Sequence, residues 1–495
     1  MKVPEILLTA DRSLMNNFHL KGEFVSAWYG SADSLPWWVF KLMAGEPEKD
    51  DNHEIVFAPY PLRKIQATML DAGFDAAIVS PKDLPRLVGS AKILGIHTIN
   101  PLGLGTSPIF RQLLLNDREY SVKYFRKLLE KNAVKAARKN GLKVIVGGSG
   151  AWQLQASPEI QKKLGIDCVI VGEAERLVPD IIRKGLQGEE LPRYVECTKE
   201  NVPGLHDISC IRKASNYGCI EVGRGCVRGC KFCNVSKNKL RWIPLANIEN
   251  ELRVNARYGI TQGLLHAEDI LLYGTKGVIP DVDTLLKLIK LTKTYYQKFH
   301  VTHFSLAAVS AEPQVIPKCM ELILENQSFM LGETGIETGS VRLLSETMSG
   351  KVKPFKNEKW IEIIHNSLGI LHDNSFIPYC SLILGLPGEQ EEDMVLTLDL
   401  LDDLKKYRCA LLPLNFTPLG ELHTQRAFSA MLSTIDDLHK QIIARCNRHN
   451  LYWVDRTRHE LFQQSGYRML LHILAKVRMK QFEGKAKKFG LLAAK

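Results

Sequence analysis

The sequence has no cysteine before Cys168 and no long run of uncharged apolar residues. A membrane-spanning helix needs about 18 such residues, so we expect no membrane segment and no membrane partner. Glu5 and Asp11 interrupt the apolar residues at the start of the chain, which excludes the pattern of a secretory signal. The 11 cysteines are an odd number spread over 495 residues, which is not the pattern of a disulfide framework. We therefore expect a cytoplasmic protein.

The composition is that of an ordinary globular protein, with 45% hydrophobic and 24% charged residues. A chain of this length favours two or three domains. The formal net charge of +11 suits nucleic acid, an acidic protein or an anionic cofactor, and its sign does not choose among them. Much of the excess lies in residues 476–490, where a solvated terminal helix is the simplest interpretation and a partner-binding tail is the alternative.

Residues 1–186 alternate short β-branched runs with amphipathic helical patterns. Continuous apolar strands separated by helices predict a parallel sheet covered on both faces, which is a doubly wound, Rossmann-like α/β domain. Ligands of such domains bind beyond the carboxyl ends of the strands, where glycine-rich turns let them approach the backbone. Three such turns are present, at residues 100–108, 146–152 and 171–175.

The remaining residues suggest a second α/β region. A polar, proline-containing segment, 187–217, is predicted to be a linker. Residues 218–420 then carry six strand-like runs separated by helical patterns, which predicts a partial (β/α)6 barrel of the TIM type with functional residues at its strand ends. Residues 421–495, rich in Arg, His and Tyr near their middle, are predicted to form a helical C-terminal cap that contributes to the substrate region.

The most specific motif is GRGCVRGCKFCN (223–234), which places Cys226, Cys230 and Cys233 in the loop after the first of these strands. Thiolates at this spacing can close on one metal centre, and the interspersed glycines permit the backbone angles of a tight loop. A structural zinc site normally uses four protein ligands, and the nearest further cysteine, Cys219, lies inside an apolar strand. Three ligands favour a cubane iron–sulfur cluster with one open iron.

The spacing C-x3-C-x2-C, with Phe232 before the last cysteine, resembles the radical S-adenosylmethionine (radical SAM) superfamily. Residues 335–351 and 381–389 resemble its fourth-strand and fifth-strand segments. The resemblance implies that the three cysteines hold a [4Fe-4S] cluster whose open iron binds the amino and carboxylate groups of S-adenosylmethionine.

The resemblance also supplies roles for three strand-end residues. Glu268 would bind the methionine amino group, although His266-Ala267-Glu268 departs from the family's Gly-Gly-Glu pattern. Glu337 would contact the ribose or methionine part, and Ile383 would pack on adenine. A structural salt bridge is the alternative for Glu268, and ordinary core packing is the alternative for Ile383.

The N-terminal domain, with GIHTINPLGLG (95–105) and VIVGG (144–148), resembles the cobalamin-binding domain of the cobalamin-dependent (class B) radical SAM methyltransferases. The Asp-x-His-x-x-Gly motif that supplies a cobalt ligand in other cobalamin domains is absent, because Val56 stands where Asp51-Asn52-His53 would need the glycine. The tRNA methylthiotransferases are disfavoured, because their N-terminal domain carries three further cysteines and this chain has none before Cys168. Residues expected to line the corrin and its tail, with ordinary turn chemistry as the alternative, are Thr98, Asn100, Leu102, Gly103, Thr106, Gly147, Gly148, Gly172 and Glu173.

These resemblances imply a C-methyltransferase that moves a methyl group from S-adenosylmethionine through methylcobalamin to an unactivated sp3 carbon. No acid–base catalytic residue is assigned, because hydrogen-atom abstraction depends on positioning. The size and the basic C-terminal region resemble the archaeal enzymes that methylate a glutamine of methyl-coenzyme M reductase. We therefore expect a protein substrate and an external electron donor, and no nucleic acid. The alternatives are a cobalamin-dependent radical enzyme that acts on a small molecule without methyl transfer, and a non-catalytic cobalamin sensor with a structural metal site.

Overall fold

The computed structural model describes residues 4–15, 46–105, 120–235, 238–417, 436–462 and 484. The chain divides into two compact units, which we call the N-terminal unit and the barrel unit. The N-terminal unit comprises Met1–Gly105, Asp117–Cys219 and Arg253–Ile260, and the barrel unit comprises Thr106–Asn116, Ile220–Leu252 and Thr261–Lys495.

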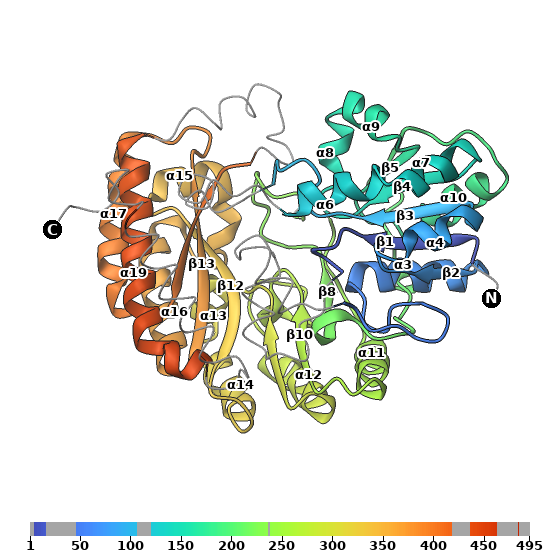
Figure 1. Cartoon of the computed structure of the whole chain (residues 1–495). Coiled ribbons are helices and arrows are strands. Elements are labelled where there is room, and N and C mark those ends of the chain that lie inside the picture. The colour runs from blue at the N-terminus through green and yellow to red at the C-terminus, as the bar shows by residue number, and fades with distance from the viewer. Residues whose placement is uncertain are drawn as a thin grey trace. The chain divides into compact units, whose positions relative to one another are not determined.

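The N-terminal unit is built on a six-stranded sheet in the order β2-β1-β3-β4-β5-β6, of which β1 to β5 are labelled in Figure 1. Every neighbouring pair is parallel, as the apolar runs predict. The chain winds outward from β1 to β2 and then in the other direction from β3 to β6, so the topological switch point lies between β1 and β3. The strands are β1 (Ile6–Ala10), β2 (Ala76–Ile78), β3 (Ile93–His97), β4 (Lys143–Gly147), β5 (Cys168–Val171) and β6 (Tyr194–Glu196).

Alternate strand residues feed two separate hydrophobic cores, one on each face of this sheet. Ile6 and Leu8 join the core under α3 and α10, whereas Leu7 joins the core under α4, α6 and α7. The doubly wound prediction is therefore confirmed for this unit. Its helices are α3 (Tyr60–Asp71), α4 (Leu84–Leu87), α6 (Tyr120–Leu129), α7 (Asn132–Lys139), α8 (Trp152–Gln155), α9 (Pro158–Leu164) and α10 (Val178–Leu186).

The segment 187–217, predicted to be a linker, is part of this unit. It contains β6, which extends the sheet by pairing with β5. The linker prediction is wrong there, because an exposed edge strand of three residues carries almost no hydrophobic pattern. Lys213 within the segment also bonds to Asp50 and Glu54, at 2.8 and 2.7 Å.

A buried arginine fastens the same segment to α3. The Arg63 guanidinium, 1% exposed, donates to the carbonyl oxygen of Ala214 at 2.9 Å and to Glu54 Oε1 at 3.0 Å. It also donates to the carbonyl oxygens of Ile55 and Val56. Each donation satisfies a polar group that water cannot reach.

We expect Arg63→Met to lower the free energy of unfolding of the N-terminal unit by about 3–5 kcal/mol, because it leaves the Glu54 carboxylate and three carbonyl oxygens without this donor. Chemical denaturation followed by circular dichroism measures this. Arg183→Met, which removes the exposed pair with Asp180, is the control and should change stability by less than about 1 kcal/mol. Equal, small effects of both variants would contradict the assignment.

The barrel unit contains two three-stranded sheets, β11-β10-β7 and β12-β13-β14, in which β10–β11, β12–β13 and β13–β14 pair parallel. A parallel bridge between His303 and Glu333 joins the sheets, so the strands follow one another in chain order. This confirms the prediction of six strands in a partial barrel. The strands are β7 (Cys219–Glu221), β10 (Gln262–His266), β11 (Lys298–Val301), β12 (Met330–Glu337), β13 (Phe376–Leu384) and β14 (Ala410–Asn415).

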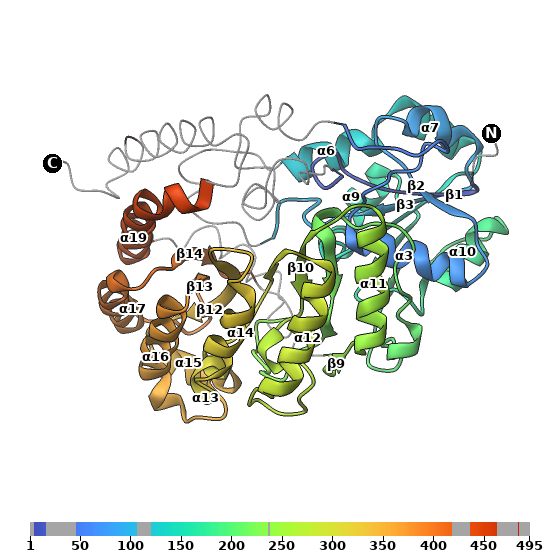
Figure 2. The ribbon, with the colours of Figure 1, turned by 90° about the horizontal axis from the view of Figure 1, so that it is seen from below.

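Helices form an outer layer around these strands (Figure 2). They are α11 (Leu245–Arg257), whose residues from Arg253 on belong to the N-terminal unit, α12 (Val282–Tyr295), α13 (Leu306–Ala311), α14 (Val315–Ile323), α15 (Val341–Met348), α16 (Trp360–Asp373), α17 (Glu391–Asp403) and α19 (Asp437–Phe462). Among the described residues, no helix combines the length and the apolar character needed to cross a membrane.

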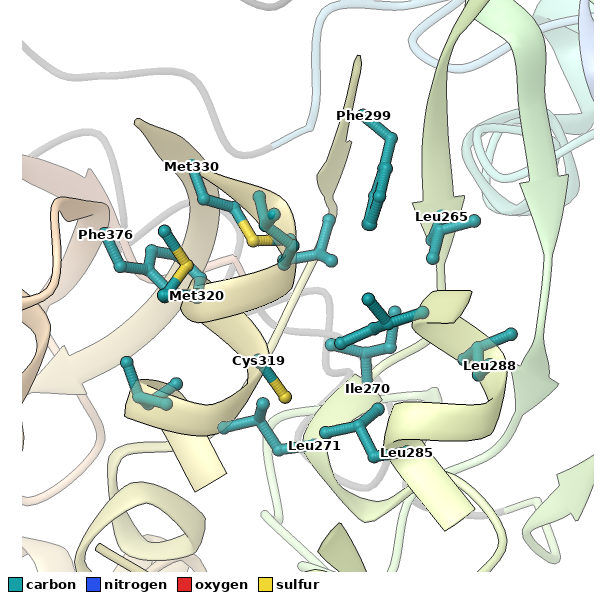
Figure 3. A pocket seen from close by; sticks show the side chains of 14 residues that line it. Leu265, Ile270, Leu271, Leu285, Leu288, Phe299, Cys319, Met320, Met330 and Phe376 are labelled. Atoms are coloured by element: carbon teal, nitrogen blue, oxygen red, sulfur yellow. The ribbon is translucent and has the colours of Figure 1, made fainter. Parts of the chain in front are cut away.

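The layer between strands and helices is apolar. Figure 3 shows Leu265, Phe299, Met330 and Phe376 of four strands beside Leu285, Leu288, Cys319 and Met320 of α12 and α14. They line a cavity of about 20 Å³. Because the lining is entirely apolar, a water molecule would find no hydrogen-bond partner in it, and we assign the cavity to core packing.

The described part of the predicted C-terminal cap, α19, packs against α17 and β14 (Figure 2). Asn450 donates to the carbonyl oxygen of Leu411 and accepts from its N–H, both at 2.7 Å, so the helix satisfies the free backbone edge of β14. In this part of the chain, α19 therefore covers a strand edge. The rest of 421–495, apart from residues 436–462 and 484, lies outside the described residues.

A buried histidine at the start of α19 links stability to pH. His439 bonds to Glu389 at 2.8 Å. Burial lowers the pKa of His439, but the hydrogen bonds and charges of Glu389 and, to a smaller extent, Asp436 outweigh burial, and the net pKa is raised. The His439–Glu389 pair therefore stabilises the fold fully below about pH 6.5, the unfolded-state pKa, and this contribution is lost as the pH rises through the folded-state pKa.

We expect His439→Gln to remove the loss of melting temperature that His439 causes as the pH rises. His206→Gln is the control, because His206 is exposed, and this variant should keep the pH dependence of the melting temperature that the wild type shows.

Candidate metal centre

The three cysteines lie in a loop between β8 (Gly223–Arg224) and β9 (Arg241–Trp242), which pair antiparallel. Gly225 has φ +85°, and a Cβ there would lie 2.6 Å from the carbonyl oxygen of Lys239. Gly229 has φ +67° with open space around it. The loop thus needs glycine for space at the first position and for backbone conformation at both.

Burial and neighbouring charges both influence the pKa values of Cys226 and Cys230. Burial raises the pKa of Cys226 to about 11, and the Cys230 thiolate raises it as well. Burial also raises the pKa of Cys230, where the Lys351 ammonium opposes the effect of Glu337 and Cys233. The charge of Arg228 lowers the pKa of both thiols. Thiolates in this site therefore depend on a metal or on these two cations for compensation.

The motif contains two arginines that could supply charge to the thiols, Arg224 and Arg228, and in the structure Arg224 is paired elsewhere. Arg224 Nε donates to both carboxylate oxygens of Glu221, each at 2.8 Å. Lys351, far away in sequence, supplies the second cation instead. No local pattern marks Lys351, and sequence reasoning missed it.

The number of thiols bears on the kind of metal centre. Cys226, Cys230 and Cys233 are three donors from one loop. A structural zinc ion normally takes four protein ligands, whereas a cubane cluster can be held by three thiolates with one iron left open. The donor set therefore fits a cluster better than a structural zinc ion.

Glu337 ends β12 beside this loop. It is 6% exposed and has φ +64°, after a register shift that begins at Gly335. Its carboxylate accepts from Lys351 Nζ at 2.8 Å and from Ser381 Oγ at 3.0 Å. A Cβ on Gly335 would lie 1.7 Å from Glu337 Oε1. A non-glycine residue at positive φ costs energy, and such strain concentrates at functional sites.

The two other residues predicted to contact S-adenosylmethionine also lie at strand ends of the barrel. Ile383 is half-buried on the same side of β13 as Ser381, whereas Leu382 and Leu384 on the opposite side are buried. Glu268 follows β10 and is half-buried, while its neighbour Asp269 is only 5% exposed. The structure thus brings Glu337 and the loop together. The roles of the three residues toward the cofactor stay predictions.

The described residues predicted to line a corrin lie at or beyond the carboxyl ends of β3, β4 and β5. Thr98 is fully buried next to the topological switch point, and its hydroxyl has no hydrogen-bond partner in the described part of the chain. An unsatisfied hydroxyl there fits a ligand site at this edge of the sheet. Thr106 lies outside the described residues.

The loop after β3 is held by a buried amide that sequence reasoning missed. Gln153 Oε1 accepts from the N–H of Leu102 at 2.9 Å, and Gln153 Nε2 donates to Asn100 Oδ1 at 2.7 Å. Asn100 Oδ1 also accepts from the N–H of Gly105. The side chain of Asn100 is thus used to shape the loop.

Packing inside the N-terminal unit accounts for two of the predicted glycines. A Cβ on Gly148 would lie 2.5 Å from His97 Nδ1, and a Cβ on Gly172 would lie 2.8 Å from Cys197 Cβ. Gly148 has φ +108° and Gly172 has φ +91°, a backbone conformation that residues with a side chain rarely adopt. Glycine is required at these positions without any ligand, and the corrin roles of the whole set stay predictions.

Comparisons with known proteins identify the domain that carries the cysteines. Residues 220–401 match the model of the radical SAM superfamily, and this segment, from β7 to α17, is a radical SAM domain. The structure resembles a radical S-adenosylmethionine methyltransferase, TsrM, from Kitasatospora setae with cobalamin and a [4Fe-4S] cluster bound. The TM-score is 0.55 at 13% identity, covering 85% of this chain and 77% of that chain. The likeness shows a shared fold.

A second structure of TsrM, with tryptophan substrate and an S-adenosylmethionine analogue bound, also has a TM-score of 0.55 and covers 82% of this chain. Among sequence relatives, an uncharacterised protein of Methanopyrus kandleri is 23% identical over 67% of both chains. A tRNA-2-methylthio-N(6)-dimethylallyladenosine synthase of Thermotoga petrophila is 23% identical over 52% of this chain. This chain spans 56% of that synthase and 60% of a putative methylthiotransferase of Methanocaldococcus jannaschii, which is 27% identical.

Proposed function

We propose that this protein is a cobalamin-dependent radical SAM methyltransferase. The observation that carries the proposal is the fold match to TsrM, which spans 85% of this chain and therefore includes more than the radical SAM domain. The N-terminal unit has the doubly wound sheet that suits a nucleotide-tailed cofactor, with its switch point between β1 and β3. The barrel unit has the three cysteines in one charged loop.

In this proposal, Cys226, Cys230 and Cys233 hold a [4Fe-4S] cluster, and Glu268 and Glu337 bind S-adenosylmethionine. The strand ends of the N-terminal unit hold cobalamin. When bound, these groups supply a hydrogen-abstracting radical and a transferable methyl group. The chain itself contributes position and charge: Lys351 bonds to Glu337 and offsets the charge of Cys230.

We extend the proposal to an unactivated sp3 carbon of a protein, a glutamine of methyl-coenzyme M reductase, and to an external electron donor. The size of the chain and its basic C-terminal region support this choice of substrate class. The methylthiotransferase relatives favour a second candidate, methylthio transfer to tRNA. The absence of cysteine before Cys168 opposes it, because those enzymes use three N-terminal cysteines for a second cluster.

The first test is the iron, sulfide, zinc and cobalt content of protein made anaerobically in cobalamin-fed cells. We expect four irons and one cobalt per chain, the stoichiometry of one cubane and one cobalamin. Iron without cobalt would overturn the cobalamin-dependent reaction, and zinc without iron would favour the sensor.

The second test supplies S-adenosylmethionine with a deuterated methyl group. Separate reactions contain a glutamine peptide of methyl-coenzyme M reductase or unmodified tRNA, and mass spectrometry follows the label. Label in the peptide supports the proposal, and a methylthio group in the tRNA supports the second candidate. 5′-Deoxyadenosine without label in either acceptor would favour the small-molecule alternative.

A further inference from the structure

Arg228 lies between two of the cluster cysteines in sequence, and its side chain points away from solvent, with 5% exposure. One terminal nitrogen donates to Asp269 Oδ2 at 3.1 Å and to Ser305 Oγ at 2.6 Å. The other donates to the carbonyl oxygen of Lys353 at 2.5 Å. One side chain thus ties the cysteine loop to segments that follow three other strands, β10, β11 and β12.

The partners of Arg228 are themselves fixed. Asp269 Oδ1 accepts from the N–H of Ser305 at 3.1 Å, and Asp269 Oδ2 accepts from Ser305 Oγ at 2.6 Å. Ser305 caps α13 by accepting from the N–H of Ala308. Because Asp269 is 5% exposed, water hardly reaches its carboxylate, and these donors satisfy its hydrogen bonding instead.

The backbone of Arg228 is held as tightly as the side chain. Its N–H donates to Cys226 Sγ at 3.4 Å, and its carbonyl oxygen lies against Gly350, where a Cβ would approach to 1.7 Å. Lys231, further along the same loop, donates its N–H to the carbonyl oxygen of Thr347 at 3.0 Å. The loop has little freedom to move relative to the strand ends.

The position of Asp269 gives this arrangement a functional meaning. Asp269 directly follows Glu268, the residue that the proposed function assigns to the amino group of S-adenosylmethionine. The loop that would carry the cluster and the turn that would carry Glu268 are therefore joined by one buried ion pair.

We propose that the Arg228–Asp269 pair is a positioning device that fixes the cluster loop relative to Glu268, and so sets both S-adenosylmethionine affinity and the potential of the cluster. The inference rests on the proposed function. Groups that orient ligands in this way typically contribute tenfold to a hundredfold in affinity or activity. A cation held next to a cluster also favours its reduced form, which is the more negative one.

Three variants of the holoenzyme separate geometry from charge. Arg228→Lys keeps the charge but cannot reach three acceptors with one ammonium group. Arg228→Gln removes the charge as well, and Asp269→Asn removes the opposite charge. Arg342→Gln is the matched control, because Arg342 also pairs with a buried carboxylate, Asp393, elsewhere in the barrel unit.

The measurements are iron and sulfide content, the dissociation constant of S-adenosylmethionine by anaerobic equilibrium dialysis, and the cluster's reduction potential by titration followed with electron paramagnetic resonance. We expect all three variants to bind S-adenosylmethionine at least about tenfold more weakly. We expect a lower potential for Arg228→Gln, a higher one for Asp269→Asn, and one near that of the wild type for Arg228→Lys. The control should match the wild type throughout.

Three outcomes of this experiment decide between the inference and its alternatives. Variants that retain iron with unchanged affinity and potential would overturn the inference, as would effects equal to those of the control. Variants that fold normally but lose iron, while the control keeps it, would support a role in holding the loop. A wild-type protein without iron would refute the proposed function itself and is distinguished from both by the metal analysis.

Discussion

Cys230→Ala is expected to abolish binding of the iron–sulfur cluster and all radical chemistry that depends on it. Cys230 is 8% exposed, and the charges of Lys351, Glu337 and Cys233 all influence its pKa. With three protein ligands for four irons, the loss of one leaves two irons without a protein thiolate. Iron and sulfide analysis and electron paramagnetic resonance of the dithionite-reduced protein measure the result.

The control for this variant is Cys319→Ala. Cys319 is also buried, but it lines the apolar cavity between the strands and the helices of the barrel unit (Figure 3). Its removal should cost some packing energy and leave four irons per chain. If Cys230→Ala retained four irons, the trio would not be the ligand set, and another thiol would have to be sought among the described cysteines.

The cysteine loop and the strands could be predicted because their signals are local. Cys226, Cys230 and Cys233 fall within eight consecutive positions, and each parallel strand is a short apolar run between helical patterns. β6 was missed for the same reason, because a short exposed edge strand has no apolar run.

The partners that complete the site could not be predicted, because the fold alone brings them together. Lys351 reaches Glu337 and Asp269 reaches Arg228 only when the ends of separate strands meet at one edge of the barrel. Gln153 supports the loop after β3 in the same non-local way. A buried ion pair between distant residues leaves no spacing pattern in a single sequence.

A glycine-rich turn can suggest a ligand site in the sequence where the structure shows close packing. The turn at Gly147-Gly148 was interpreted as a place for a ligand to approach, yet the ring of His97 occupies the space next to Gly148. A glycine that makes room for the chain's own atoms and one that makes room for a ligand look identical in sequence. The structure distinguishes them by what a Cβ would meet.

Gly350→Ala is expected to disrupt the metal centre although residue 350 carries no ligand. A Cβ there would lie 1.7 Å from the carbonyl oxygen of Arg228 and 2.8 Å from its carbonyl carbon. Real Cβ contacts do not come under 3.0 Å, so either the cysteine loop or the turn Ser349–Val352 must move by more than an ångström. Neither is free to do so. Lys351 in the turn bonds to Glu337, and Arg228 holds the loop by its bond to Asp269.

We therefore expect Gly350→Ala to retain less than about a tenth of the wild-type iron after anaerobic reconstitution, the scale seen when groups that orient metal ligands are lost. Overpacking should also lower the free energy of unfolding by about 1–3 kcal/mol. Gly277→Ala is the matched control, because no atom lies within 4 Å of its Cβ position. Full iron content in Gly350→Ala would show that the loop can yield, and the rigid positioning inferred for Arg228 would then lose its structural basis.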